Sequence, residues 1–272
     1  MNKEKSTLKG FHYPLTAKGK STLNPSPPWY YSSDFLYIEF WADPSAVASL
    51  LPEGLDVDPS ANGHCGAFFY DWQFSGENEE YLDPARYQYR EFFILLDALF
   101  EGRPVSYNPY IFVDNDAAFA RGWSQGYPKR IAEVFQTRYH AATGKAGPTL
   151  APGSKFAGSI SSSGQRLAEG LVTLKEPLKD ISALKLRPVV CLLHTPRLAA
   201  DKRNQPAVHE LVENVPGDVK IEQAWIGEGS LMLPVCRGEE VSDLAPVRCG
   251  VGLRASMSYI VNDLKTLKDL RK

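Results

Sequence analysis

The sequence has few of the residues that mark metal, disulfide and nucleic-acid-binding proteins. Its 4 cysteines in 272 residues form no C-x-x-C pair, so we expect reduced thiols rather than a zinc site or a disulfide framework. Its 5 histidines form no H-E-x-x-H pattern, and we expect no metal. A formal net charge of −2, with Lys and Arg scattered along the chain, gives no basic footprint for nucleic acid.

Long apolar runs and nucleotide-binding glycine loops are also absent. No run approaches the roughly 20 apolar residues that a membrane span requires, and no signal-peptide pattern begins the chain. Neither a Walker loop nor a G-x-G-x-x-G segment occurs. We therefore expect a soluble cytoplasmic protein that binds neither membranes nor nucleic acid.

What the chain does contain is a series of short strand patterns. The segments with this pattern are 29–40, 66–74, 87–100, 109–113, 134–140, 155–161, 167–174, 188–194, 208–212, 220–225, 230–233 and 250–261. One short helix should begin at Asp43, with Pro44 in its first turn. The pattern predicts a mainly β, α+β protein of antiparallel sheets or a barrel with few short helices. We expect an irregular arm over residues 1–28 and a single domain over 29–272.

Two features near the C-terminus complete this prediction. Segments 220–225 and 230–233 are expected to pair as a hairpin across the glycines at 227 and 229. A closing helix, capped by Asn262 or Asp263, is expected to follow the last strand and end at Lys272. On that last strand Tyr259 is the one member of the apolar face with a polar tip.

Residues 114–130, DNDAAFARGWSQGYPKR, concentrate ionisable groups and glycines directly after an apolar strand. An extended chain would place Arg121 and Lys129 about 26 Å apart, so one pocket can hold both only if the chain folds back. Gly122 and Gly126 supply the backbone freedom for that bend. Together with Pro128, they argue against a long regular element here.

This stretch supports two kinds of chemistry. Gly122 to Gly126 fits the G-x-S-x-G pattern, which would make Ser124 an acylated nucleophile, although Pro128 follows too soon for the helix that such an elbow needs. Alternatively, Lys129 lies next to Arg130, and a lysine that is desolvated or crowded by a second cation loses its proton near neutrality and can form a Schiff base with a ketone.

The stretch VDNDAAFARGWSQGYPKR resembles the signature of the acetoacetate decarboxylase superfamily, and LLPEGLDV at 50–57 resembles a second segment of that family. The resemblance implies a β-barrel or cone fold, a homo-oligomer and a Schiff base on Lys129. Arg130 stands where the decarboxylases carry a second lysine, so we expect it to tune the pKa of Lys129. Because a lysine imine is itself an electron sink, no organic cofactor is expected.

The same family carries a catalytic glutamate in a Y-x-E segment, which corresponds to Glu91. On a strand, Glu91 shares a face with Tyr89, Phe93 and Leu95, so its carboxylate must be paired or have a raised pKa. Glu91 is therefore a candidate acid/base, with a structural ion pair as the alternative.

One departure bears on the reaction. Where the decarboxylases have a first-strand arginine, this chain has Ser32, Ser33 and Asp34. Arg121 resembles instead the carboxylate-binding arginine of the branch that condenses pyruvate with aldehydes, and Tyr259 resembles a residue of that branch that faces the imine.

We assign Lys129, Glu91 and Tyr259 to catalysis, with an ordinary core tyrosine as the alternative for Tyr259. Arg121, Tyr127 and Trp123 are assigned to substrate binding. The predicted activity is a lyase that condenses a short oxo acid such as pyruvate with an aldehyde and removes water, or runs the reverse hydration. Three alternatives are a 3-oxo acid decarboxylase, a serine hydrolase using Ser124, and a non-catalytic binding protein.

Overall fold

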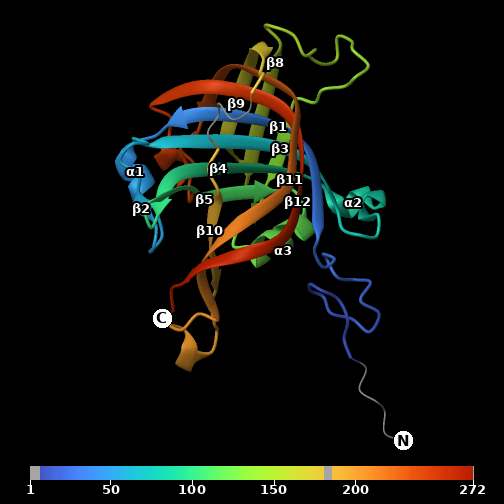
Figure 1. Cartoon of the computed structure of the whole chain (residues 1–272), viewed down its shortest axis with the longest axis vertical. Coiled ribbons are helices and arrows are strands. Elements are labelled where there is room, and N and C mark those ends of the chain that lie inside the picture. The colour runs from blue at the N-terminus through green and yellow to red at the C-terminus, as the bar shows by residue number, and fades with distance from the viewer. Residues whose placement is uncertain (1–6, 181–185, 272) are drawn as a thin grey trace, which may run out of the picture.

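Alternating apolar and polar residues fold into strands along most of the chain, and the computed structural model joins them in one 12-stranded sheet (Figure 1). The structure describes residues 7–180 and 186–271. The strands are β1 (Trp29–Trp41), β2 (Asp56–Val57), β3 (His64–Ser75), β4 (Gln88–Phe100), β5 (Arg103–Val113), β6 (Lys129–Ile131), β7 (Glu133–Gln136), β8 (Lys155–Ser162), β9 (Gln165–Pro177), β10 (Val189–Thr195), β11 (Val208–Met232) and β12 (Arg248–Asp269). The predicted mainly β, α+β class is confirmed.

The helices are short and lie at the ends of the strands. They are α1 (Pro44–Ser49), α2 (Pro84–Tyr87) and α3 (Asp116–Ser124), with 3-10 turns η1 (Glu80–Leu82), η3 (Ala200–Lys202) and η4 (Val241–Leu244). As predicted, Asp43 caps α1, accepting a hydrogen bond from the backbone N–H of Ser45, and Pro44 opens the helix. None of the described helices combines the length and apolarity needed to cross a membrane.

Part of the sheet closes into a ring. The strand order runs β10-β5-β4-β3-β1-β12-β11, and an additional β10–β11 pairing joins its two ends. The long strands β11 and β12 sweep round the stack formed by β1, β3, β4 and β5 (Figure 1). Pairing is antiparallel except between β5 and its neighbours β10 and β6. Closure removes free sheet edges and creates an interior that side chains can line.

The remaining strands, β9, β8 and β7, continue the sheet from β11 and pack on the outside of the ring. Phe156, Ile160 and Val172 from this layer share a buried core with Ile38 of β1 and Phe69 of β3. The alternate residues of the ring strands point inward and form a second, aromatic cluster. The two faces of the same strands therefore bury two separate sets of side chains.

The predicted closing helix is wrong, because β12 continues as a strand to Asp269. Val261, Leu264, Leu267 and Leu270 recur every three residues, which favours a helix locally. The segment pairs instead with β11, where Val212 lies opposite Thr266. Leu267 and Leu270 then pack against the core that the outer strands share with β1 and β3. Strand pairing in the folded protein therefore overrides the local helical pattern.

The predicted hairpin at 227–229 is also wrong, since β11 runs unbroken through these glycines. A Cβ on Gly227 would lie 1.9 Å from the carbonyl oxygen of Thr173, and one on Gly229 would lie 2.9 Å from that of Val251. The glycines allow close approach of neighbouring strands rather than a turn. Further upstream, β7 ends at Gln136, earlier than the predicted strand end at residue 140.

Helix α3 was not predicted. Asn115 begins it by accepting a hydrogen bond from the N–H of Ala118 at 2.9 Å, and Gly122 lies inside it. The described part of the N-terminal arm is irregular, with one isolated bridge between Lys9 and Thr16. Through Asn24, the arm reaches the side chain of Arg121 in α3.

Candidate active site

A cavity of about 500 Å³ lies inside the ring of strands. Every strand of the ring contributes lining residues, and most of the lining is apolar or aromatic. An enclosed, mainly apolar cavity with a few polar groups is the usual form of a small-molecule site.

Lys129 begins β6 and points into this cavity, with 6% of its surface exposed. Its strand pairs in parallel with β5, where Ile111 lies opposite Lys129. The ammonium nitrogen Nζ lies 2.6 Å from Oε2 of Glu91 on β4. It also lies 5.4 Å from the ring centre of Tyr89 and 5.9 Å from that of Tyr127.

Burial is the main cause that lowers the pKa of Lys129 below its ordinary value of 10.5. The negative charge of Glu91 opposes this shift, while the positive charge of Arg121 adds to it. Desolvation disfavours the charged ammonium, so burial shifts the equilibrium toward the neutral amine, which is the nucleophilic form.

Gly122 makes room for the lysine side chain. A Cβ at this position would lie 2.3 Å from Cδ and 2.5 Å from Cε of Lys129, so any other residue here would displace the lysine side chain. Gly126, with φ of +82°, then turns the backbone from α3 toward β6. The fold-back that the sequence requires between Arg121 and Lys129 is therefore made by a helix and a glycine turn.

Glu91 lies on β4 with Tyr89, Phe93 and Leu95 on one face, as predicted, and all four line the cavity. Its Oε1 accepts a hydrogen bond from Nε1 of Trp72 at 3.2 Å, while Oε2 faces Lys129. The carboxylate is thus paired, in a position from which it can exchange a proton with the lysine amine or with a group bonded to it.

Arg121 is a buried residue, 2% exposed, and not a surface ion-pair residue. Its guanidinium carbon lies 3.8 Å from the ring centre of Phe74, and Nη1 donates to Oδ1 of Asn24 at 2.8 Å. Within residues 7–180 and 186–271, no carboxylate pairs with it, and its guanidinium interacts with the hydroxyls of Tyr31 and Tyr89. A buried cation in this state attracts an anion.

Two tyrosines assigned to the site also line the cavity. Tyr259 stacks on Tyr31, with ring centres 4.9 Å apart, and the hydroxyl of Tyr127 accepts a hydrogen bond from Nδ2 of Asn214 at 3.0 Å. Burial raises the pKa of both Tyr259 and Tyr127 well above 10, so both hydroxyls keep their protons.

Two assignments are corrected by the structure. Arg130 points away from the cavity and forms a bidentate ion pair with Glu239, with nitrogen–oxygen distances of 2.6 and 2.7 Å. Adjacent residues of a strand face opposite sides, so Arg130 cannot share the environment of Lys129, and Arg121 is the cation that lowers its pKa. Trp123 is 59% exposed and donates its indole N–H to the carbonyl of Lys129, outside the cavity.

Ser124 is the last residue of α3 and lies at the surface. A nucleophile elbow places serine on a turn from a strand into a helix, so the elbow interpretation of G-x-S-x-G is wrong. The hydroxyl of Ser124 contacts Nε2 of His12 in the N-terminal arm. Among the described residues, no carboxylate hydrogen-bonds to this imidazole.

The far end of the cavity holds polar residues that were not assigned from the sequence. His64 lies between Asp97, at 2.8 Å, and Glu39, at 3.2 Å. Burial opposes charging, but these two carboxylates raise the pKa of His64 to about 9, so it is a cation at neutral pH. Arg187 also pairs with Asp97, at 3.2 Å. Asn108 of β5 lies on this part of the wall, and only the register of the strands could have revealed these neighbours.

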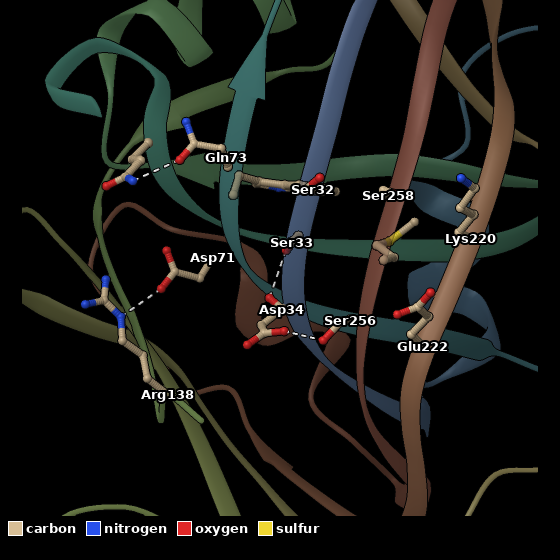
Figure 2. A pocket seen from close by; sticks show the side chains of 13 residues that line it. Ser32, Ser33, Asp34, Asp71, Gln73, Arg138, Lys220, Glu222, Ser256 and Ser258 are labelled. Atoms are coloured by element: carbon tan, nitrogen blue, oxygen red, sulfur yellow. Dashed lines mark hydrogen bonds and ion pairs between the residues drawn. The ribbon is translucent and has the colours of Figure 1, made fainter. Parts of the chain in front are cut away.

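A second hollow, of about 570 Å³, lies on the outer face of β1, β3 and β12 (Figure 2). Its wall carries Asp34, Asp71, Arg138 and serines, and Figure 2 shows Asp71 joined to Arg138 and Asp34 joined to Ser256. These groups are paired with one another and open to solvent. We call it the outer pocket, and the hollow that contains Lys129 the lysine cavity.

One cysteine, Cys191, lies close enough to Lys129 for their charges to interact. All four cysteines are free, with Cys65 and Cys191 buried and the other two partly exposed. Over residues 7–180 and 186–271, no group of three or more His, Cys, Asp or Glu side chains is arranged to hold a metal ion.

Comparison with known proteins identifies the family. The sequence model of the family described as acetoacetate decarboxylase (ADC) matches residues 12–270. The chain therefore belongs to the acetoacetate decarboxylase family, whose members, like the related MppR, are lyases. An acetoacetate decarboxylase of Chromobacterium violaceum is 25% identical over 240 residues, which cover 86% of this chain and 84% of the relative.

Solved structures give closer matches. The enduracididine biosynthesis enzyme MppR, complexed with the condensation product of pyruvate and imidazole 4-carboxaldehyde, is 33% identical with a TM-score of 0.89, covering 98% of this chain and 99% of that one. MppR complexed with pyruvate has a TM-score of 0.88 at 33% identity, covering 97% and 99%. An acetoacetate decarboxylase-like enzyme from Sphingomonas wittichii RW1 is 25% identical with a TM-score of 0.87, covering 96% and 100%.

Proposed function

We propose that this enzyme condenses pyruvate, or a closely related 2-oxo acid, with an aldehyde through an imine on Lys129 and then removes water. The observation that carries the proposal is the buried Lys129 amine, 2.6 Å from Glu91 inside a closed cavity, with its pKa lowered mainly by burial. The similarity to MppR, whose solved complexes contain pyruvate and a pyruvate–aldehyde condensation product, supports the same choice of substrates.

The first stage makes the electron sink. The Lys129 nitrogen attacks C2 of the oxo acid, and Glu91 gives a proton to the hydroxyl that leaves as water, so that a C2=N iminium replaces the C2=O bond. Arg121 attracts the substrate carboxylate, since a buried guanidinium that no carboxylate of the described residues neutralises suits a carboxylate oxygen.

The second stage makes the new carbon–carbon bond. A proton leaves C3 to give an enamine, and C3 then attacks the aldehyde carbon while the aldehyde oxygen takes up a proton. Loss of one of the two remaining C3 protons and of the new hydroxyl as water gives the conjugated imine, and a second water releases the 2-oxo-3-enoic acid and the free amine. Glu91 and Tyr259 line the cavity in which these protons move. Glu91 lies beside Lys129, and Tyr259 lies elsewhere on the cavity wall with its hydroxyl protonated.

Decarboxylation of a 3-oxo acid is the second candidate, favoured by the family match and by the curated relatives. Against it, β1 brings no cation into the lysine cavity, where it contributes Tyr31 and Tyr37. Ser32 and Asp34 face the outer pocket instead.

The test is to incubate the enzyme with pyruvate and borohydride and to map the reduced adduct by peptide mass spectrometry. We expect the adduct on Lys129. No adduct on Lys129 with any short oxo acid would contradict the mechanism. Enone absorbance from pyruvate plus an aldehyde, compared with carbon dioxide release from acetoacetate, then separates condensation from decarboxylation.

A further inference from the structure

Asn108 is a polar residue of the lysine cavity that has no role in the proposed steps. It is 1% exposed, and neither Oδ1 nor Nδ2 has a hydrogen-bond partner among the described residues. Its side chain lines the cavity. Burying an amide with both polar atoms unpaired is unfavourable, so such a group in a cavity wall indicates a ligand that completes its hydrogen bonds.

A β-bulge places Asn108 in this position. Between β4 and β5 the register passes from Ile94–Tyr110 to Leu96–Tyr107, so Asn108 and Pro109 both lie opposite Leu95. A bulge changes the direction of side chains and is common next to active sites. The other edge of β5 is paired only on either side of Asn108, with β10 at 106–107 and with β6 from Ile111 onward.

The position of Asn108 along β5 sets its distance from Lys129. Lys129 lies opposite Ile111, and Asn108 precedes Ile111 by three residues, which is about 10 Å of strand. One six-membered ring with its substituents spans about 6 Å. A separation of this size along the strand, in a cavity of about 500 Å³, accommodates the body of an aromatic aldehyde.

The wall of the lysine cavity carries stacked rings. Phe93 stacks on Phe68 with ring centres 4.8 Å apart and on Tyr70 at 5.5 Å. All three rings line the cavity. Such a wall favours a planar, unsaturated molecule, because ring faces stack with one another.

The charges near Asn108 are already neutralised by partners. Asp97 pairs with His64 and Arg187, and Glu213 pairs with Arg103. A charged substituent on the ligand would have to break one of these pairs, whereas a neutral donor–acceptor group needs only the free amide. The polarity at this end therefore selects a neutral group.

We propose that Asn108 recognises the second substrate, and that this substrate is a planar aromatic aldehyde whose far end carries a neutral group able to donate and accept hydrogen bonds. The inference rests on the proposed function and specifies its aldehyde. Asn108 is thus a specificity residue that contacts the part of the aldehyde remote from the new bond.

The test compares 4-hydroxybenzaldehyde, benzaldehyde and 4-formylbenzoate as partners of saturating pyruvate, measuring kcat/KM from enone absorbance. For the wild type we expect a kcat/KM with 4-hydroxybenzaldehyde roughly tenfold above that with benzaldehyde, because one additional buried hydrogen bond contributes about this factor. The lowest kcat/KM is expected with 4-formylbenzoate. In Asn108→Leu, which keeps the branched shape of the side chain but not its hydrogen bonds, the ratio should fall to about one while benzaldehyde turnover remains.

The control variant is Asn204→Leu, an exposed asparagine outside the lysine cavity, which should keep the wild-type ratio. Borohydride trapping of pyruvate on Lys129 checks that Asn108→Leu is folded; if it is not, Asn108→Ser serves in its place with the same expected loss of selectivity. A wild-type ratio of one, or a ratio unchanged in the folded Asn108 variant, overturns the proposal.

A binding measurement separates this proposal from the reaction itself. Calorimetry with 4-hydroxybenzyl alcohol and benzyl alcohol, which form no imine, should show roughly tenfold tighter binding of the former to the wild type and equal binding to Asn108→Leu. If trapping on Lys129 fails but this difference appears, the proposed function is wrong and the recognition site stands. If trapping succeeds and the two alcohols bind equally, the recognition proposal is wrong.

Discussion

The lysine cavity and the outer pocket lie on opposite faces of the same strands. On β1, Tyr31 faces the cavity and Ser32 faces the outer pocket, and on β12 Tyr259 and Ser258 divide in the same way. The two hollows have similar volumes, about 500 and 570 Å³. They differ in what surrounds their ionisable groups.

In the outer pocket, ionisable groups remain in water and pair with each other, as Arg138 does with Asp71 at 2.8 Å. In the lysine cavity, the ring of strands buries the lysine, and this burial lowers the pKa of Lys129. Each hollow contains a lysine, since Lys129 lines the lysine cavity and Lys220 lines the outer pocket. The comparison teaches that enclosure, rather than residue type, distinguishes the lysine that we propose as the nucleophile.

The strongest test of this contrast replaces one lysine at a time. Lys129→Met should abolish the borohydride adduct with pyruvate and lower condensation by about 10³-fold or more, because the imine cannot form. The matched variant Lys220→Met should keep both. Loss of the adduct in Lys220→Met, or its survival in Lys129→Met, would contradict our assignment of imine formation to the lysine cavity.

The buried and exposed arginines provide the next test. Arg121→Met should raise the KM for pyruvate roughly 10- to 100-fold, since a charge-assisted hydrogen bond to the carboxylate is lost. Arg138→Met, in the outer pocket, should leave KM unchanged. Steady-state kinetics with pyruvate gives both values, and equal effects of the two variants would contradict the carboxylate role of Arg121.

The packing of the lysine against α3 can be tested through a glycine. Gly122→Ala should lower the rate of imine trapping about tenfold and destabilise the fold by about 1–3 kcal/mol, because its Cβ would overlap the Lys129 side chain. Gly144→Ala, where a Cβ meets no atom within 4 Å, should change neither property. Trapping rates and thermal unfolding provide the measurements, and a fully active Gly122→Ala would show that the lysine position is adaptable.

The pH dependence of trapping tests the electrostatics. Imine formation needs the neutral amine, so its rate rises as pH increases through the pKa of Lys129. Glu91 raises that pKa and Arg121 lowers it, so the midpoint should move to lower pH in Glu91→Gln and to higher pH in Arg121→Met. Glu222→Gln, in the outer pocket, should leave the profile in place. Shifts in the opposite directions would refute this account of the site.

The smallest effect is expected for the residue next to the lysine. Arg130→Gln should change kcat and the pH profile less than twofold, because Arg130 faces solvent and pairs with Glu239. A shift of the profile as large as that of Arg121→Met would restore the tuning role that its sequence position suggests.

Several elements could be predicted because their signals are local. The N-terminal cap of α1 and the shared face of Tyr89 and Glu91 follow from turn residues and from alternation along one strand. The closing helix and the hairpin at Gly227 were wrong because pairing between β11 and β12 outweighs local preference. The misplacement of Arg130 follows from missing β6, since alternation would have separated it from Lys129.

The sequence by itself determined the family motif, the mainly β class and the identity of the candidate nucleophile. It could do so because these depend on residue type and short-range spacing. Only the tertiary structure decided which cation acts on Lys129, how Glu91 meets it, and that Asn108 lines the same cavity. Those relations arise from strand register and ring closure, which bring together residues that are distant along the chain and exclude the water that would otherwise screen their charges.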